Sequence, residues 1–247
     1  MFVAASTECF RSLPLTEALE RLTDLEFSSV EVALHEQGCQ LRPSEVVADF
    51  TRCVDRCRNT RRLDVVAYSV EIAATGDEYY RQFEAICRLA KATKVVTLTV
   101  PSGELGTPFN EEVERLQRLV DIATLEGIRV AMRSQVGCLS EDPDTVVVLC
   151  DNVKGLGLTL DPSHYTFGRE RNYDKLYKYV YHVHLRDTTK DKLQVRVGQG
   201  SIEYGRLIAS LRKVGYNRVL GIDMSEMEDV DHMAELRKMR LLLESLL

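Results

Sequence analysis

The sequence predicts a single α/β domain, residues 1–247, folded as a (β/α)8 TIM barrel. Short apolar stretches alternate with amphipathic stretches eight times, without a linker or a shift in composition. The apolar stretches are nearly continuous, as expected for parallel strands covered on both faces. A length of 247 residues is typical of eight strand–helix units. A doubly wound open sheet is the alternative, and it is disfavoured because no GxGxxG motif follows the first strand.

The first half of the chain supplies four of the predicted strand–helix units. Its first helix shows the pattern well, because Leu15, Leu19 and Leu22 recur on one stripe after Pro14. Gly127 is a C-cap signal that ends the fourth helix. The predicted strands are Phe2–Thr7, Val30–His35, Asp64–Ile72 and Val95–Val100, and the later helices span about 43–59, Asp77–Lys91 and Glu111–Glu126.

The second half repeats the same scheme up to the C-terminal helix. Each predicted strand is again followed by an amphipathic stretch. The strands are Arg129–Ser134, Leu156–Leu160, Tyr181–Leu185 and Arg218–Met224, and the helices are Asp144–Asp151, Tyr173–Tyr179, Tyr204–Val214 and about 230–246.

Composition narrows the classes of function. The net charge is −6, so the chain lacks the basic balance of a nucleic-acid binder, and the arginines between residues 52 and 62 are interpreted as a solvated helix surface. No apolar run approaches the length of a membrane span and no signal peptide opens the sequence, so we expect a cytoplasmic protein. Seven cysteines without a CxxC pair indicate reduced thiols.

In a barrel of this class the active site lies at the carboxyl ends of the strands. Two stretches are informative there: Leu158-Thr-Leu-Asp-Pro-Ser-His164 and Tyr181-His-Val-His-Leu-Arg-Asp187 each end a strand in residues that can bind a metal or move a proton. The candidates at the strand ends are Glu31, His35, Glu71, Arg133, Gln135, Asp161, His164, His184, Asp187 and Asp223.

Several candidates also have a purely structural interpretation. Asp161 and His164 could cap the turn after the sixth strand, and Glu31 could be a structural acid inside the barrel. His182 shares the strand parity of His184, so both point inward or both point outward, and we interpret it as a barrel-interior histidine. The loop cations Arg186, Lys190, Lys192 and Arg196 could be solvated or could receive an anionic substrate.

These motifs, with the Val197-Gly-Gln-Gly200 loop before Ile202-Glu-Tyr and Gly215-Tyr before the last strand, resemble the xylose isomerase-like barrel superfamily. The resemblance is best over residues 129–224. That superfamily includes sugar phosphate isomerases and epimerases, hydroxypyruvate isomerase, inosose dehydratase and endonuclease IV of the AP endonuclease family 2 type. It implies a role in carbohydrate metabolism and no nucleotide cofactor. Many members are dimers or tetramers, which leaves a homo-oligomer open for this chain.

The resemblance also implies a metal site, from which this sequence departs. Members hold a divalent ion (Mn, Mg, Zn or Co) with Glu, Asp, His and Glu on strands five to eight. Asp161 and His184 match this pattern and Asp223 is a shortened version of the last ligand, whereas Arg133 stands where the first Glu should be. An arginine is always charged and fits carboxylates with its planar fork. Arg133 could therefore take the place of the metal ion by bridging Asp161 and Asp223, or it could point away and pair with a helix carboxylate.

The expected function is that of a sugar isomerase or epimerase-like barrel acting on a small polyhydroxy carbonyl compound. The residues expected to act in catalysis are Asp223, His164 and Asp161, and those expected to bind substrate are His164, Arg133, His184, Glu31, Arg186 and Lys190. One alternative is a catalytically degraded barrel that binds a polyol or hydroxy acid without turnover, and a metal-free lyase or dehydratase is another. An endonuclease IV-like repair enzyme is a remote alternative, because the chain has five histidines and an acidic pI.

Overall fold

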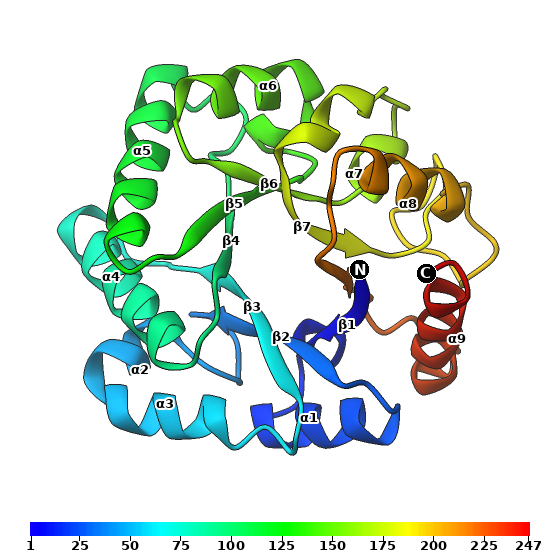
Figure 1. Ribbon diagram of the computed structural model, residues 1–247, viewed down its shortest axis with the longest axis horizontal. Coiled ribbons are helices and arrows are strands. Elements are labelled where there is room, and N and C mark those ends of the chain that lie inside the picture. Colours follow the sequence, from blue (N-terminus) through cyan, green and yellow to red (C-terminus); the bar gives the residue numbers. More distant parts are fainter.

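Eight parallel strands form a closed barrel in the order of the sequence, which confirms the predicted (β/α)8 fold (Figure 1). The computed structural model describes all residues from 1 to 247. Each strand pairs with the next, and β8 returns to pair with β1. The strands are β1 (Phe2–Ser6), β2 (Ser29–His35), β3 (Asp64–Glu71), β4 (Thr97–Pro101), β5 (Arg129–Arg133), β6 (Gly157–Leu160), β7 (Val180–Leu185) and β8 (Val219–Ile222).

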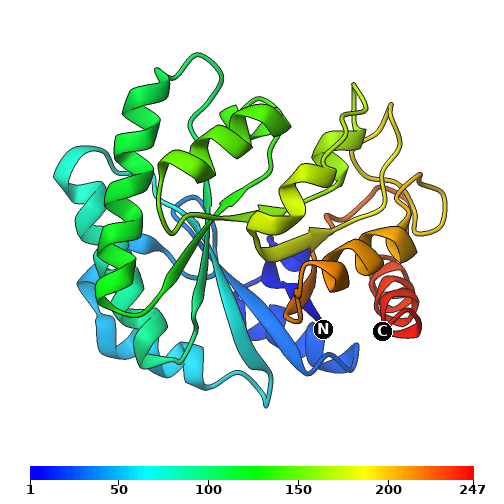
Figure 2. The same cartoon turned by 45° about the horizontal axis from the view of Figure 1, so that its top comes forward.

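The helices surround this barrel as an outer ring (Figures 1 and 2). Their apolar stripes and the outward-facing residues of the strands together form one continuous hydrophobic core. No helix is both long enough and apolar enough to cross a bilayer. The helices are α1 (Leu15–Asp24), α2 (Pro43–Ala48), α3 (Phe50–Arg58), α4 (Gly76–Ala92), α5 (Phe109–Leu125), α6 (Pro143–Asn152), α7 (Ser163–Thr166), α8 (Tyr204–Lys213) and α9 (His232–Ser245).

Two predicted helices differ from the observed elements. The stretch predicted as one helix over about 43–59 is divided into α2 and α3 at Asp49, whose φ of −145° is not helical. The carboxylate of Asp49 accepts a hydrogen bond from the backbone N–H of Arg52, so this residue caps the start of α3. The helix predicted over Tyr173–Tyr179 is a 3-10 helix over Asp174–Tyr179.

Closure of the ring brings the two ends of the chain together. Helix α9 packs against β1 and β8, and the two termini lie side by side in both views (Figures 1 and 2). Closure also places the carboxyl ends of β6, β7, β8 and β1 next to one another on one rim of the barrel. We call this carboxyl-end rim the mouth, and it is where the side chains of the candidate site meet.

Candidate functional site

The mouth contains a guanidinium that joins two aspartates. Arg186 follows β7, and its Nη2 donates to Oδ2 of Asp161 at 3.0 Å and to Oδ2 of Asp223 at 2.8 Å. Asp161 follows β6 and is fully buried, whereas the side chain of Asp223, after β8, is 17% exposed. Burial alone would raise the pKa of Asp161, but Arg186, together with His164, Ser163 and His184, holds that pKa below its ordinary value. We call Arg186, Asp161 and Asp223 the guanidinium bridge.

The expectation that Arg133 bridges the two aspartates is therefore wrong. Nη2 of Arg133 instead donates to Oε1 of Glu71 at 2.6 Å and to Oε1 of Gln135 at 2.8 Å. The reason lies in the order of the strands, because β7 stands between β6 and β8, while β5 is separated from β8 by two strands. A side chain from β7 can reach both aspartates, and one from β5 instead reaches Glu71 at the end of β3.

Below the guanidinium bridge lies a second polar group made of Glu31, His182 and His184, which we call the inner cluster. Nε2 of His184 lies 2.9 Å from Oε1 and 3.1 Å from Oε2 of Glu31, and Nε2 of His182 lies 2.6 Å from Oε2. All three side chains are fully buried, so both histidines point inward. Gly221 leaves room for the cluster, because a Cβ there would lie 3.2 Å from Nε2 of His182 and 2.8 Å from the carbonyl oxygen of Val183.

The charges of the inner cluster are coupled. Burial alone would raise the pKa of Glu31, but the adjacent imidazoles of His184 and His182 hold it well below its ordinary value of 4.5. Burial alone would lower the pKa of His184, but the carboxylates of Glu31, Asp223 and Asp161 together raise that pKa above 6.5. In the chain without a bound metal ion, these shifts favour a charge pair between the buried Glu31 and His184.

This ion pair makes stability depend on pH. The raised pKa of His184 gives stability that is complete below 6.5 and is lost as pH rises through the folded-state value. The lowered pKa of Glu31 gives stability that is present above 4.5 and is lost as pH falls through its folded-state value. The advantage of the wild type over Glu31→Gln, measured by urea unfolding, is therefore expected to be largest between these two pH values and to shrink above 6.5. Glu244→Gln, on the exposed face of α9, is the control, and an advantage that stays constant up to about pH 9 would contradict the assignment.

His164, in α7, has a tautomer fixed by the backbone. Its Nδ1 accepts a hydrogen bond from the N–H of Val136 at 3.2 Å, so the proton of the neutral ring lies on Nε2. Nε2 is 3.6 Å from Oδ2 of Asp161, which is too long for a hydrogen bond. Burial lowers the pKa of His164, and Asp161 only partly opposes this. At neutral pH the ring is therefore an uncharged donor beside the guanidinium bridge.

The residues that could hold a metal ion differ from the set implied by the resemblance. Asp161, His184 and Asp223 do lie together, but the guanidinium of Arg186 takes the space between the two carboxylates. A divalent ion placed there would lie against a fixed positive charge. The inner cluster, by contrast, offers two imidazole nitrogens and a carboxylate oxygen within 4.8 Å of one another, and these could hold a metal ion.

Other predicted residues lie apart from the guanidinium bridge. Nδ1 of His35 lies 3.2 Å from Oε1 of Glu8, and its Nε2 lies 3.2 Å from Oγ of Ser69. Glu71 is occupied by Arg133. Lys190 lines a surface cavity of about 420 Å³ beside the start of α8. One member of the site, Ser163, was not among the predicted residues. Ser163 donates to Asp161 through its hydroxyl and its backbone N–H, and its place inside the Asp-Pro-Ser-His motif was the available signal.

Asp187 holds the backbone of the loop that follows β7. Its Oδ2 accepts from the backbone N–H groups of Gly198 and Gly200 at 2.8 and 2.9 Å, and its Oδ1 accepts from the N–H of Thr188 at 3.1 Å. These bonds fix the loop between β7 and α8 beside the mouth. A Cβ on Gly200 would lie 1.9 Å from Oδ1 of Asp187, so only glycine fits this approach.

Gly200→Ala is therefore expected to lower the free energy of unfolding by about 1–3 kcal/mol, because the added methyl group must displace Asp187 or the loop backbone. Gly205→Ala is the control, since nothing lies within 4 Å of a Cβ there and the residue is inside α8. Alanine should stabilise that helix by about 0.5–1 kcal/mol. Chemical unfolding measures both changes, and equal stabilities for the two variants would refute the packing argument.

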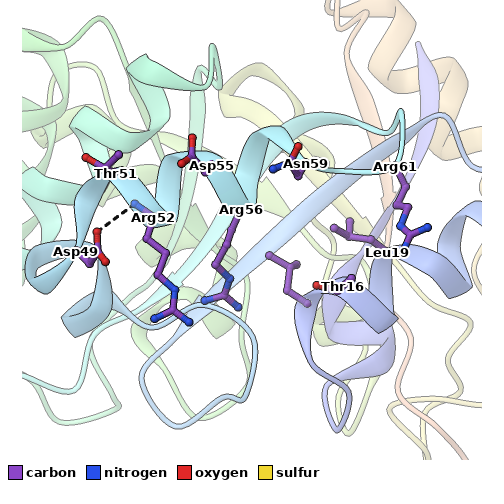
Figure 3. Close-up of a pocket in the computed structure, with 10 residues that line it drawn as sticks. Thr16, Leu19, Asp49, Thr51, Arg52, Asp55, Arg56, Asn59 and Arg61 are labelled. Atoms are coloured by element: carbon purple, nitrogen blue, oxygen red, sulfur yellow. Dashed lines mark hydrogen bonds between the residues drawn. The ribbon is translucent and has the colours of Figure 1, made fainter.

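A surface cavity of about 660 Å³ lies between α1 and α3, and none of the candidate site residues lines it (Figure 3). Arg52, Arg56 and Arg61 line it together with polar side chains. Arg56 donates to Oε2 of Glu45 and Arg61 pairs with Glu20. These partners agree with the interpretation of this stretch as a solvated helix surface.

Several known proteins have a fold similar to that of this chain. A model of the xylose isomerase-like TIM barrel family matches residues 19–245. Among solved structures, a xylose isomerase domain protein from Planctomyces limnophilus superposes with a TM-score of 0.70 at 16% identity, covering 100% of this chain and 95% of that one. D-allulose 3-epimerase from Methylomonas sp. gives 0.77 at 14% identity, with 100% and 98% covered. The IolI protein, solved with a zinc atom, gives 0.71 at 15%, with 100% and 96% covered.

A curated relative matches only part of the chain. An uncharacterized protein of Methanocaldococcus jannaschii is 26% identical over 134 residues, which are 50% of this chain. The match spans 46% of that protein, or about half of its length.

Proposed function

The chain belongs to the xylose isomerase-like TIM barrel family, and from this membership we propose an enzyme that isomerises a small polyhydroxy carbonyl compound without a metal ion at its mouth. Its structural neighbours include L-ribulose 3-epimerase and D-tagatose 3-epimerase-like protein, so the barrel is of the sugar isomerase and epimerase type. The observation that carries the proposal is the position of Arg186 between Asp161 and Asp223. A fixed positive charge stands there, where the family resemblance implies a metal ion.

A guanidinium can supply the charge that this chemistry needs. Removing a proton next to a carbonyl group places negative charge on the carbonyl oxygen, and fixed positive charge near that oxygen lowers the barrier. Arg186 is held by two carboxylates through Nη2 alone, and its Nη1 donates no hydrogen bond within the protein. Nη1 and the Nε2–H of His164 are thus the two donors proposed for the substrate oxygens.

Asp223 is the carboxylate that we assign as the base. Asp161 is fully buried, and its two oxygens accept hydrogen bonds from Ser163 and Arg186. We therefore assign it the role of positioning Arg186. Asp223 is partly exposed, and only its Oδ2 is bound by Arg186, which leaves Oδ1 to accept a proton. One base reaches one face of a planar enediolate, so it can move a proton between adjacent carbons on that face. Epimerisation needs a base on each face, and Arg133 stands where the resemblance implies the second one.

The experiment is solvent exchange followed by NMR. The purified chain is incubated in D2O with a panel of aldoses, ketoses and hydroxy acids. We expect one compound of the panel to take up deuterium at a carbon next to its carbonyl group and to be converted into its aldose or ketose isomer. Added Mn²⁺, Mg²⁺ or Co²⁺ should not raise the rate of either change. A rate that depends on the added metal would refute the role of Arg186, and inversion at a single carbon would refute the single-base mechanism.

A second candidate is a barrel that binds a polyol or hydroxy acid without turnover. It is favoured by Arg133, which is bound to Glu71 and supplies no second acid–base group. Thermal stabilisation by a compound of the panel without any deuterium uptake would support this candidate against the first. A cytoplasmic location, a small-molecule partner and the absence of a nucleic-acid partner remain predictions, as does the homo-oligomer.

A further inference from the structure

We propose that the inner cluster is a zinc site, which is separate from the guanidinium bridge and shares only His184 with the ligand set that the family resemblance implies. The site would use His182 Nε2, His184 Nε2 and a carboxylate oxygen of Glu31. Two of these three residues, Glu31 and His182, have no counterpart among the implied ligands on strands five to eight. The proposal does not depend on the substrate or the base proposed above, although Asp223 and Arg186 of the mouth adjoin the site.

The first support is an unsatisfied nitrogen. Nε2 of His182 is buried and lies 2.6 Å from Oε2 of Glu31, yet outside the directions in which the two can form a hydrogen bond. A fully buried polar atom without a partner is costly, and it needs an explanation. A cation between this nitrogen and the carboxylate would give the nitrogen lone pair a partner. The side chain of His182 is 1% exposed, so bulk water does not satisfy it.

The second support is the geometry of the three ligand atoms. They lie within 4.8 Å of one another, and the shortest separations are 2.6 and 2.9 Å. Zinc bonds of about 2.0–2.2 Å in a tetrahedral arrangement require ligand atoms separated by roughly 3.3–3.5 Å. The two shortest separations therefore have to open by roughly 0.4–0.9 Å to admit the ion. Two imidazoles and one carboxylate are ligands that zinc commonly takes, and they leave a fourth position.

The third support is the neighbour of His184. Its Nδ1 is buried, makes no hydrogen bond and lies 3.6 Å from Oδ2 of Asp223. Metal-bound histidines usually direct their second ring nitrogen at a carboxylate, which fixes the tautomer. Asp223 stands where that second carboxylate is needed. With Nε2 on the metal, the proton of His184 would lie on Nδ1 and face Asp223.

The fourth support is the balance of charge. Ionised Glu31, Asp161 and Asp223 carry three negative charges and Arg186 one positive charge, which leaves two negative charges in a region where only Asp223 is partly exposed. One divalent cation balances them with both imidazoles neutral. The competing arrangement places protons on the imidazoles instead, so zinc and protons compete for the same nitrogens.

The test measures metal content rather than activity. The whole chain is produced in zinc-supplemented medium, washed with a mild chelator, and its zinc is quantified by inductively coupled plasma mass spectrometry. We expect about one zinc per wild-type chain, and less than about a tenth of that in Glu31→Gln and in His182→Gln. Asp161→Asn is the matched control in the guanidinium bridge, and it should keep its zinc. Circular dichroism establishes that each variant is folded.

X-ray absorption on the wild type needs no variant. Its zinc edge should show two imidazoles and oxygen at about 2.0–2.2 Å. Wild-type chain that holds no zinc, even after refolding in excess zinc, would overturn the proposal in favour of a protonated cluster. Zinc that is lost in Asp161→Asn but kept in His182→Gln would place the ion at the mouth and overturn it as well.

Discussion

Asp223→Asn is expected to lower kcat for substrate deuterium exchange by about 10²- to 10⁴-fold, the contribution of a general base. The amide keeps the size of the side chain and an acceptor for Arg186, but it cannot take a proton. Since Asp223 is the only carboxylate of the guanidinium bridge that is partly exposed, no neighbouring carboxylate of the bridge can replace it. KM should change little, because Arg186 and His164 still bind the substrate oxygens. Stopped-time NMR in D2O gives both constants.

Glu226→Gln is the matched control for this experiment. Glu226 lies three residues further along the same loop, is exposed, and undergoes the same change of charge. It should leave kcat unchanged. If Asp223→Asn retained more than about a third of the wild-type kcat, Asp223 would not be the base, since even modest general bases contribute more than this.

Arg186→Met is expected to lower the free energy of unfolding by about 3–5 kcal/mol, the usual cost of leaving a buried charge without its partner. Asp161 is fully buried, so its carboxylate would lose its cation while staying out of water. Methionine retains much of the packing of the arginine stem. Added Mn²⁺ should recover part of this loss in the variant, because Asp161, Asp223 and His184 then face a site without a fixed cation. Urea unfolding with and without Mn²⁺ measures both effects.

Arg133→Met is the control that makes this result specific. The partner of Arg133 is Glu71, whose side chain is 45% exposed, so water can solvate it after the change. A loss of about 1 kcal/mol or less is expected, with no response to Mn²⁺. Equal losses in the two variants would show that the guanidinium bridge has no special weight in the stability of the barrel.

The barrel could be predicted from the sequence because its signals are local. Each strand is an apolar run and each helix an amphipathic stripe, and the closed order of eight units follows from their number and length. The meeting of Asp161, His184 and Asp223 could also be predicted, since carboxyl ends of neighbouring strands converge on one rim. The break at Asp49 was missed because a single capping aspartate inside an amphipathic pattern is a weak signal.

The choice between two arginines could not be made from motif position alone. Arg133 stands at the position of a family ligand. Its side chain can contact only groups near the end of β5, and there it donates to Glu71. One sequence signal did favour Arg186. It lies two residues after His184, which itself lies two residues after His182, so the inward alternation of β7 extends to it. The contact of Glu31 with both histidines joins strands that are far apart in sequence, and only the closed ring reveals it.

The guanidinium bridge has a consequence for how this barrel depends on its surroundings. A metal centre is filled only as far as the supply of the right ion allows, and an abundant wrong ion can displace it. The positive charge between Asp161 and Asp223 instead belongs to the side chain of Arg186, which is covalently attached to the chain and cannot dissociate. The positive charge at that position is therefore present even when trace metals are scarce. It is set by the amino-acid sequence and not by the metal content of the medium.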